Sequence, residues 1–240
     1  MTDHLTVYPT MQTRKKIPIT IVIVFLGGLF SFQPGMAEKT NLILKEGSPL
    51  ANEIKEVKIG NQIWMAQNLN VSRFRNGDSI PHAKSAEDWE RAGKEQRPAW
   101  CYYNNEPANE SRYGKLYNWY AVNDARGLAP AGWHIPSDLE WKQLTDYIGG
   151  NVMAGKKLKS TEGWALGGNG TNESGFGGLP GGYRYDYGFF NYAELFAIWW
   201  ASPVESISFA WLYYQPYNFG NAFRYFPNKA FGFSVRCVKN

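Results

Sequence analysis

Apolar and polar positions follow their clearest periodic pattern between residues 137 and 150. Four large apolar side chains recur there at the spacing of one helical face: Trp141, Leu144, Tyr147 and Ile148. Ser137 and Glu140 form an S-x-x-E capping box ahead of them, in which the hydroxyl accepts the Glu140 N–H and the carboxylate accepts the Ser137 N–H. Gly149-Gly150 then provides a common helix end. The pattern predicts a helix over residues 138–148.

Shorter patterns predict further elements in the first half of the chain. Apolar runs flank Gly60-Asn61, a dipeptide suited to a two-residue hairpin turn. Ser85 precedes a predicted helix that ends near residue 94, because serine is a favoured N-cap and Asp88 lies in the first turn. Two more elements are expected: a strand at residues 100–103, and a short helix or strand-to-helix transition at residues 116–123.

The chain after residue 150 has a different composition. Residues 163–182 are rich in Gly, Asn and Ser and predict a long irregular loop. Short aromatic runs follow, divided by Pro, Gly and Asn as in an antiparallel sheet: residues 183–192, 196–200, 209–214 and 223–226. Together the patterns predict an α+β fold of short antiparallel strands, one or two helices and long aromatic or Gly-rich loops.

The N-terminus has the pattern of an export signal. Arg14-Lys15-Lys16 precede an apolar stretch over residues 17–32, and Gly35-Met36-Ala37 forms a small-x-Ala cleavage site. A membrane anchor is the alternative, but the stretch is shorter than the about 20 residues that span a bilayer. We therefore expect the protein to be secreted or at the cell surface, with no membrane span after cleavage.

This pattern divides the chain into three parts. We expect a signal peptide at residues 1–37, with Met11 as an alternative start, and a polar leader at residues 38–56. A single domain is expected over residues 57–240.

Charge adds little to this picture. The full chain has a formal net charge of +4, and cleavage after residue 37 removes three bases and one acid. The mature chain is then near neutral and has no stripe of Lys or Arg, so we expect no nucleic-acid partner.

The predicted export bears on the redox state of the two cysteines. An even number of cysteines in an oxidising compartment favours a disulfide between Cys101 and Cys237. Two buried free thiols, or a reactive pair, are the alternatives.

Several motifs in order resemble the Fibrobacter succinogenes major paralogous domain, a family of secreted bacterial domains of largely undefined biochemistry. The motifs are GNQIWMAQNLNV (60–71), AWCYYNN (99–105), YGKLYNWYAV (113–122), AGWHIPSDLEW (131–141), SGFGGLPGGYR (174–184), IWWAS (198–202) and FGFSVRCVKN (231–240). The resemblance covers residues 57–240. One departure is Ala129, which stands where many members carry a cysteine, so a disulfide at that position is absent.

A looser resemblance bears on the fold. GWHIPSDLEW followed by GFSVRC is similar to the sulfatase-modifying-factor group, which implies a compact C-type-lectin-like fold. Those enzymes need two cysteines close together near the C-terminus, and only Cys237 lies there. That activity is therefore not expected, and function has to be argued from residues.

Catalytic and metal-binding patterns are weak. The chain has three histidines and no H-x-x-x-H or C-x-x-C motif, so we expect no metal site of the zinc type, and we interpret His134 as a packed histidine bonded to backbone. No Ser-His-acid order or phosphate loop can be defended. We therefore expect no enzymatic activity and no cofactor. A bound calcium ion is the alternative. Two clusters could supply its oxygen ligands: Asn104, Asn105, Glu106, Asn109 and Glu110, or Asn169, Asn172 and Glu173.

Aromatic residues supply the candidate chemistry, since the chain holds ten Trp, fifteen Tyr and fourteen Phe. Exposed rings stack on sugars, whereas buried rings form the core; we expect Trp64, Trp119, Trp133 and Trp141 to be core. The candidate ligand-binding residues are Tyr183, Arg184, Tyr185, Asp186, Trp211 and Tyr213, with Tyr187, Trp199, Trp200 and Tyr214 suited to the same surface.

These observations predict a non-catalytic domain that contacts an extracellular polysaccharide or a surface protein. Two alternatives stay open: a structural or assembly module of the cell surface, and a glycan-active enzyme with an unrecognised site.

Overall fold

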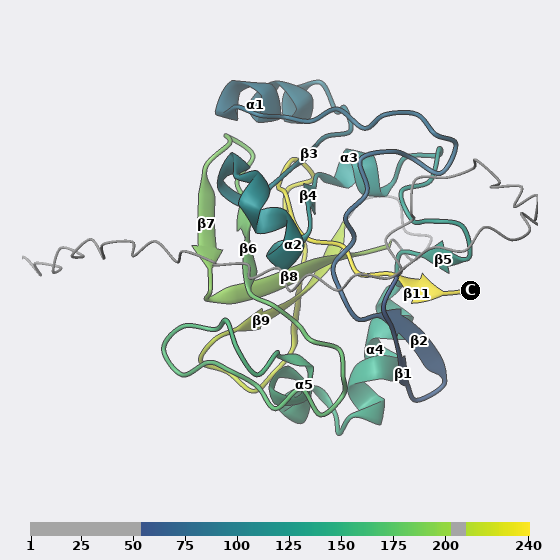
Figure 1. Ribbon diagram of the computed structural model, residues 1–240, viewed down its shortest axis with the longest axis vertical. Helices are drawn as coiled ribbons and strands as arrows, with labels where there is room; N and C mark the ends of the chain where they lie inside the picture. Colours follow the sequence, from purple (N-terminus) through teal and green to yellow (C-terminus); the bar gives the residue numbers. More distant parts are fainter. Residues whose placement is uncertain (1–53, 203–209) are drawn as a thin grey trace, which may run out of the picture. The chain divides into compact units, whose positions relative to one another are not determined.

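The computed structural model describes residues 54–202 and 210–240 (Figure 1). The predicted signal peptide and residues 38–53 of the predicted leader lie outside the described residues. An antiparallel sheet with strand order β1-β2-β11-β5 brings the start and the end of the domain together. Its strands are β1 (Glu56–Ile59), β2 (Gln62–Met65), β5 (Trp133–His134) and β11 (Val238–Lys239). The predicted hairpin at Gly60-Asn61 is confirmed, because β1 and β2 flank this turn.

The predicted aromatic strands form the second half of the fold. A three-stranded antiparallel sheet has the order β10-β9-β8, and two short ribbons pair β3 with β4 and β6 with β7. The bounds are β3 (Trp100–Cys101), β4 (Leu116–Tyr117), β6 (Gly181–Arg184), β7 (Phe190–Ala193), β8 (Phe196–Ala201), β9 (Trp211–Pro216) and β10 (Phe223–Tyr225). The predicted α+β class is confirmed.

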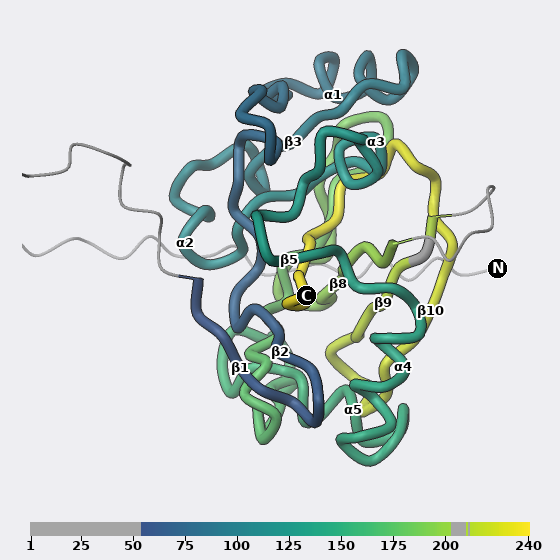
Figure 2. Tube along the Cα trace, turned by 90° about the vertical axis from the view of Figure 1, so that its right-hand side faces the viewer, coloured from purple at the N-terminus to yellow at the C-terminus, as the bar shows by residue number. Residues whose placement is uncertain are grey.

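Helices are more numerous than the one or two predicted. They are α1 (Ala86–Lys94), α2 (Glu110–Tyr113), α3 (Trp119–Val122), α4 (Asp138–Tyr147) and α5 (Asn151–Leu158), with 3₁₀ turns at Tyr103–Asn105 and Pro107–Asn109. Ser85 caps α1 through the Asp88 N–H, and the capping box of Ser137 and Glu140 is present at α4. Helix α1 lies at one end of the described domain, and α4 and α5 lie at the opposite end beside β1 and β2 (Figures 1 and 2).

The tryptophans of the sequence motifs are core residues, as predicted. Trp64, Trp119, Trp133 and Trp141 are each at most 4% exposed. Trp64 and Trp141 pack with ring centroids 4.8 Å apart, and Trp199 joins them at 5.8 Å from Trp141. Aromatic pairs at these distances add to the free energy of burial, so this cluster anchors α4 to the two sheets.

A buried polar node ties distant motifs together. The Arg236 guanidinium donates to Asn68 Oδ1, to the Met65 carbonyl (3.0 Å) and to the Phe176 carbonyl (2.6 Å). Asn68 Oδ1 also accepts from Trp199 Nε1 at 2.9 Å. Arg236 is 1% exposed, so removal of the guanidinium would take a donor away from each of these acceptors, with no water to replace it.

The predicted disulfide is wrong. Cys101 and Cys237 are both free thiols and both buried. Cys101 packs with Trp89 and Leu116, whereas Cys237 belongs to a different core cluster that includes Met65. An even cysteine count gives no information about distance, and here the fold places the two side chains in separate parts of the core.

Both thiols should therefore be unreactive until the protein unfolds. Burial raises the pKa of Cys101 to about 11 and that of Cys237 to about 12, so little reactive thiolate exists at neutral pH. We expect a colorimetric thiol reagent to detect no thiol in native protein purified without reductant, and two thiols in denaturant. An intact mass lower by two hydrogens, with stability that falls on adding reductant, would show a disulfide instead.

Removing the node at Arg236 should destabilise the fold strongly. For Arg236→Met we expect the free energy of unfolding in urea to fall by about 3 kcal/mol or more, because at least three buried acceptors lose a donor. The control is Arg91→Met, whose ion pair with Asp88 is exposed and should contribute less than about 1 kcal/mol. Equal effects of the two substitutions would refute the structural role of Arg236.

Candidate ligand-binding site

A cleft of about 330 Å³ opens where β6, β7, β8, β9 and β10 meet the C-terminal segment. We call it the aromatic cleft. Its lining residues are Tyr183, Tyr192, Phe196, Ile198, Leu212, Tyr214, Tyr225, Pro227, Phe231 and Phe233. The floor is buried, with Ile198, Leu212 and Phe233 at most 6% exposed, whereas Tyr192 and Tyr225 are 38% and 59% exposed. The cleft therefore has an apolar floor and a rim of tyrosines.

Strand register explains which aromatic residues reach the cleft. Ile198 pairs with Tyr214, and Trp199 pairs with Tyr213. Successive side chains of a strand point to opposite faces, so the first pair faces the cleft and the second faces the core. Tyr213 is 5% exposed, its ring stacks on Trp141 at 4.8 Å, and its hydroxyl lies 3.2 Å from Asp138 Oδ1.

The cleft rings are packed against one another. Tyr183 stacks on Phe231 with ring centroids 6.0 Å apart and planes inclined by 9°, and on Tyr192 at 5.6 Å. Burial raises the pKa of Tyr183, with the hydroxyl of Tyr185 adding to the effect, so the phenol stays neutral. None of the lining residues carries a charged side chain. The chemistry of the cleft is therefore apolar ring faces together with tyrosine hydroxyls.

A smaller cavity of about 260 Å³ lies beside the turn that follows β6. We call it the polar pocket, and it is lined by Glu90, Gly93, Lys94, Tyr120, Asp186, Tyr187, Asn228 and Ala230. Asn228 Nδ2 donates to Asp186 Oδ2 at 2.9 Å, and the Tyr187 N–H donates to Asp186 Oδ1 at 3.1 Å. These bonds fix the carboxylate on the pocket wall.

The structure places some of the sequence-predicted site residues at the two cavities and others in the interior. Tyr183 lines the cleft, Asp186 lines the polar pocket, and Tyr185 contacts Tyr183 through a hydroxyl–hydroxyl bond of 2.9 Å. Arg184, Tyr213, Trp199 and Trp200 are interior residues, each at most 5% exposed. Residue 211 lies in β9, but the Trp211 side chain is outside the described part of the structure.

Arg184 is buried and fixes the turn beside the two cavities through hydrogen bonds to backbone carbonyls. Its guanidinium donates to the carbonyls of Gly188 (2.9 Å), Ala83 (2.9 Å) and Ser85 (2.7 Å). These bonds hold the turn over residues 185–188 against the start of α1. The prediction that Arg184 binds a ligand at the surface is therefore wrong, because the side chain is fully buried and its donors bond to backbone carbonyls.

Sequence reasoning missed much of the cleft. Tyr192, Phe196, Tyr225 and Phe231 lie in predicted aromatic runs or motifs, but the runs carry no sign of which face each ring takes. The register of β8 with β9 assigns the face of Phe196, and the pairing of β10 with β9 places Tyr225 opposite Leu212. Tyr192 lies in β7 and Phe231 lies outside the named strands.

Four of the oxygen ligands considered for calcium form hydrogen bonds or ion pairs within the protein. Asn105 Oδ1 accepts from Arg184, and Glu110 pairs with Lys115 at 2.8 Å. In the second cluster, Asn169 Oδ1 accepts from the Trp164 N–H and Asn172 Oδ1 from the Gly177 N–H. Within residues 54–202 and 210–240, no group of three His, Cys, Asp or Glu side chains could hold a metal ion.

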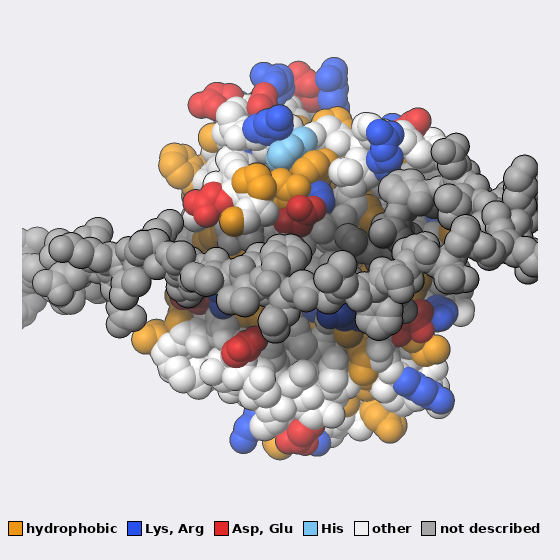
Figure 3. Space-filling model, viewed as in Figure 1, with side chains coloured by type: hydrophobic (Ala, Val, Ile, Leu, Met, Phe, Trp, Pro, Cys, Tyr) orange, Lys and Arg blue, Asp and Glu red, His pale blue; other side chains and the backbone are white. Residues whose placement is uncertain are grey.

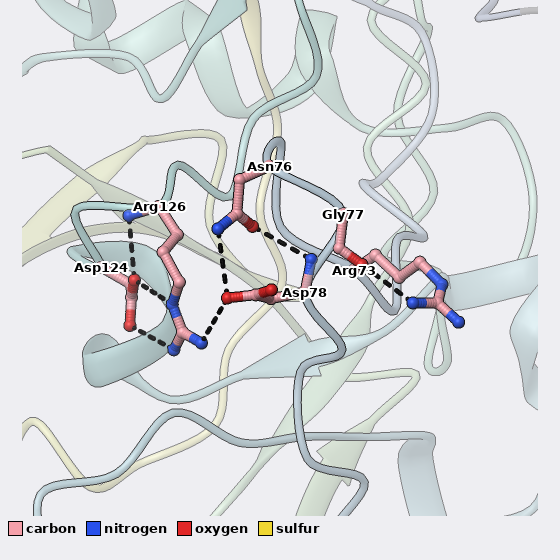
Figure 4. Close-up of polar contacts among 6 residues, drawn as sticks. All are labelled: Arg73, Asn76, Gly77, Asp78, Asp124 and Arg126. Atoms are coloured by element: carbon pink, nitrogen blue, oxygen red, sulfur yellow. Dashed lines mark hydrogen bonds and ion pairs between the residues drawn. The ribbon is translucent and has the colours of Figure 1, made fainter.

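Arg126 joins two loops through Asp124 and Asp78, and we call these three residues the clamp (Figure 4). Arg126 donates to both oxygens of Asp124 at 2.8 and 2.9 Å and to Asp78 Oδ2 at 3.3 Å. Asn76 Nδ2 also donates to Asp78, at 3.1 Å. Hydrogen bonds from Arg126 hold the pKa of Asp124 below its usual value. Hydrogen bonds from Asn76 and Arg126 likewise lower the pKa of Asp78. Because both carboxyls are held in the ionised form, the clamp suits loop fixation better than acid–base chemistry.

His134 forms side-chain bonds, so the prediction of a backbone partner was wrong. Its Nε2 lies 2.6 Å from Glu140 Oε1, and its Nδ1 lies 2.8 Å from Asn240 Oδ1. Burial opposes ionisation of Glu140, but hydrogen bonds from Ser137 and His134 outweigh it and lower the pKa of the carboxyl. The same carboxylate caps α4, so this group joins β5, α4 and the C-terminal residue.

One face of the molecule has side chains of mixed charge. On the face seen in Figure 3, acidic and basic side chains of the described residues are interspersed, without a patch of one sign. Among the helices of the described residues, none has the length and apolarity to cross a membrane.

Comparison with known proteins identifies the family. Neither the curated proteins nor the solved structures contain a match to this chain. The family model of the Fibrobacter succinogenes major domain matches residues 57–239, which is more than half of the chain. The motifs at both ends of this range meet at the buried contact of Asn68 with Arg236. The chain therefore belongs to the Fibrobacter succinogenes major domain family.

Proposed function

We propose that this protein is a non-catalytic binding domain whose aromatic cleft holds a neutral glycan. The observation that carries the proposal is the cleft lining, which combines stacked aromatic rings and tyrosine hydroxyls with no charged side chain. The C–H face of a sugar ring is apolar and packs on aromatic rings, while its hydroxyls need donors and acceptors at the edge. The exposed rim residues Tyr192 and Tyr225 supply both.

Export to the outside of the cell is part of the proposal. It rests on the signal-peptide pattern of residues 1–37, and extracellular polysaccharides are the partners that such a location provides. The C-type-lectin-like resemblance is compatible with short antiparallel strands and long loops, and it enters here as supporting analogy. We propose binding without calcium, because four of the candidate oxygen ligands already bond to other groups of the protein: Asn105, Glu110, Asn169 and Asn172.

A surface protein is the second candidate partner. Phe189, Phe219 and Phe226 are 67%, 52% and 53% exposed, which is unusual for phenylalanine. Exposed aromatic residues are enriched at protein interfaces, so these rings favour a docking or assembly role if glycans do not bind.

A glycan array with the full chain tests the proposal. We expect binding to neutral plant or bacterial glycans, equal in calcium and in a chelator. Tyr225→Ala and Tyr214→Ala should weaken it by about tenfold or more, because each removes a ring from the cleft. Tyr147→Ala is the matched control, since Tyr147 is 69% exposed and lies on α4, outside the cleft.

Two results would contradict the proposal. One is folded protein that binds no glycan, which would favour a protein partner. The other is turnover of a bound glycan that disappears in Asp186→Asn while binding persists, which would identify an enzyme.

A further inference from the structure

A row of tyrosines connects the aromatic cleft with the polar pocket. Tyr192, Tyr183, Tyr185 and Tyr187 follow one another with ring centroids 5.6, 4.9 and 4.9 Å apart. Tyr183 lines the cleft and Tyr187 lines the polar pocket. The two cavities are therefore joined by a continuous aromatic surface.

The facing wall also runs from one cavity to the other. Pro227 lines the cleft, and the next residue, Asn228, lines the polar pocket. Phe231 lines the cleft, and its ring packs on Tyr183 at 6.0 Å and on Tyr185 at 5.4 Å. Residues of the same two segments, 183–187 and 227–231, thus line both the cleft and the pocket.

The two cavities offer complementary chemistry. The polar pocket has a half-exposed ring, Tyr187 (48% exposed), beside the bonded pair of Asp186 and Asn228. Asn228 Oδ1 also accepts from the Ala230 N–H at 3.0 Å, so the second Nδ2 hydrogen of Asn228 and the remaining lone pairs of Asp186 are the positions left for ligand hydroxyls. Arg184 fixes the turn through the Gly188 carbonyl, so this wall is rigid before a ligand arrives.

We infer that the polar pocket is a second subsite of the glycan site, and that the ligand is an extended chain spanning both cavities. This inference rests on the proposed function. The aromatic side chains that line the cleft favour sugars with flat apolar faces. Neutral β-1,4-linked glucose or xylose chains have this shape, because their ring substituents are equatorial.

Titration calorimetry with β-1,4-linked glucose and xylose oligomers, from disaccharide to hexasaccharide, tests the inference on the full chain. We expect affinity to rise by about tenfold or more at the length that first fills both cavities, and then to level off. In Tyr187→Ala the rise should disappear, so that long oligomers bind as weakly as short ones. Affinity for the disaccharide should be unchanged.

Two further variants keep the test sharp. Asn228→Ala removes an exposed amide from the polar pocket and should reduce the same rise without touching an aromatic ring. Tyr147→Ala removes a still more exposed tyrosine elsewhere and should preserve the rise. Thermal unfolding of each variant shows whether it is folded.

The outcomes separate the two proposals. Binding that Tyr225→Ala weakens, but that does not depend on oligomer length or on Tyr187, overturns the two-subsite inference and leaves the glycan site in place. Absence of binding to these oligomers at every length by folded protein overturns the inference, whereas absence of binding on the whole glycan array overturns the proposed function as well.

Discussion

The buried amide of Asn68 is the contact on which the rest of the structure depends. Its oxygen accepts from Arg236 and from Trp199 Nε1, and its nitrogen donates to the Tyr113 carbonyl at 2.9 Å and to Ser234 Oγ at 3.2 Å. One side chain thus joins the loop after β2, helix α2, strand β8 and the C-terminal segment. A half-satisfied version of such a buried network is worse than an apolar core, so its members have to be present together. This explains physically why motifs near the two ends of the domain occur in one chain.

The same node determines where the aromatic cleft forms. The C-terminal segment is held at Ser234 and Arg236, and the Trp200 N–H donates to the Ser234 carbonyl at 3.1 Å. Phe231 and Phe233 precede these residues directly and are placed in the cleft by this attachment. Arg184 fixes the turn after β6 in the same way, through bonds to the carbonyls of Gly188, Ala83 and Ser85. Both buried arginines bond mainly to carbonyls rather than to carboxylates, so they order loop backbone where regular hydrogen bonding is absent.

Local signals in the sequence were enough for the early elements, but not for the site. The capping box of Ser137 and Glu140 and the Gly60-Asn61 turn depend on neighbours in the chain, and both predictions are confirmed. Residues 211–214 are all apolar or aromatic, so no alternation marks the cleft face, and a shift of one residue exchanges Tyr213 for Tyr214. Helix α5 was missed because Gly155 interrupts its pattern; that glycine is required, since a Cβ there would lie 2.4 Å from the Gly220 carbonyl oxygen.

Backbone strain at the cleft rim has a physical explanation in ring packing. Tyr192 has φ of 62°, a left-handed conformation that costs a side chain such as tyrosine about 1–2 kcal/mol. Gly182 lies opposite, and a Cβ there would meet the Ala193 nitrogen at 2.5 Å, so the two chains of the ribbon approach unusually closely. The strained conformation brings the Tyr192 ring onto Tyr183 at 5.6 Å and Phe196 at 5.0 Å. Ring contacts of this kind contribute about 0.5–1.5 kcal/mol each, which offsets the strain and fixes the rim before any ligand binds. A rim fixed in this way loses little side-chain entropy on binding, which is the property that a site built on loops otherwise lacks.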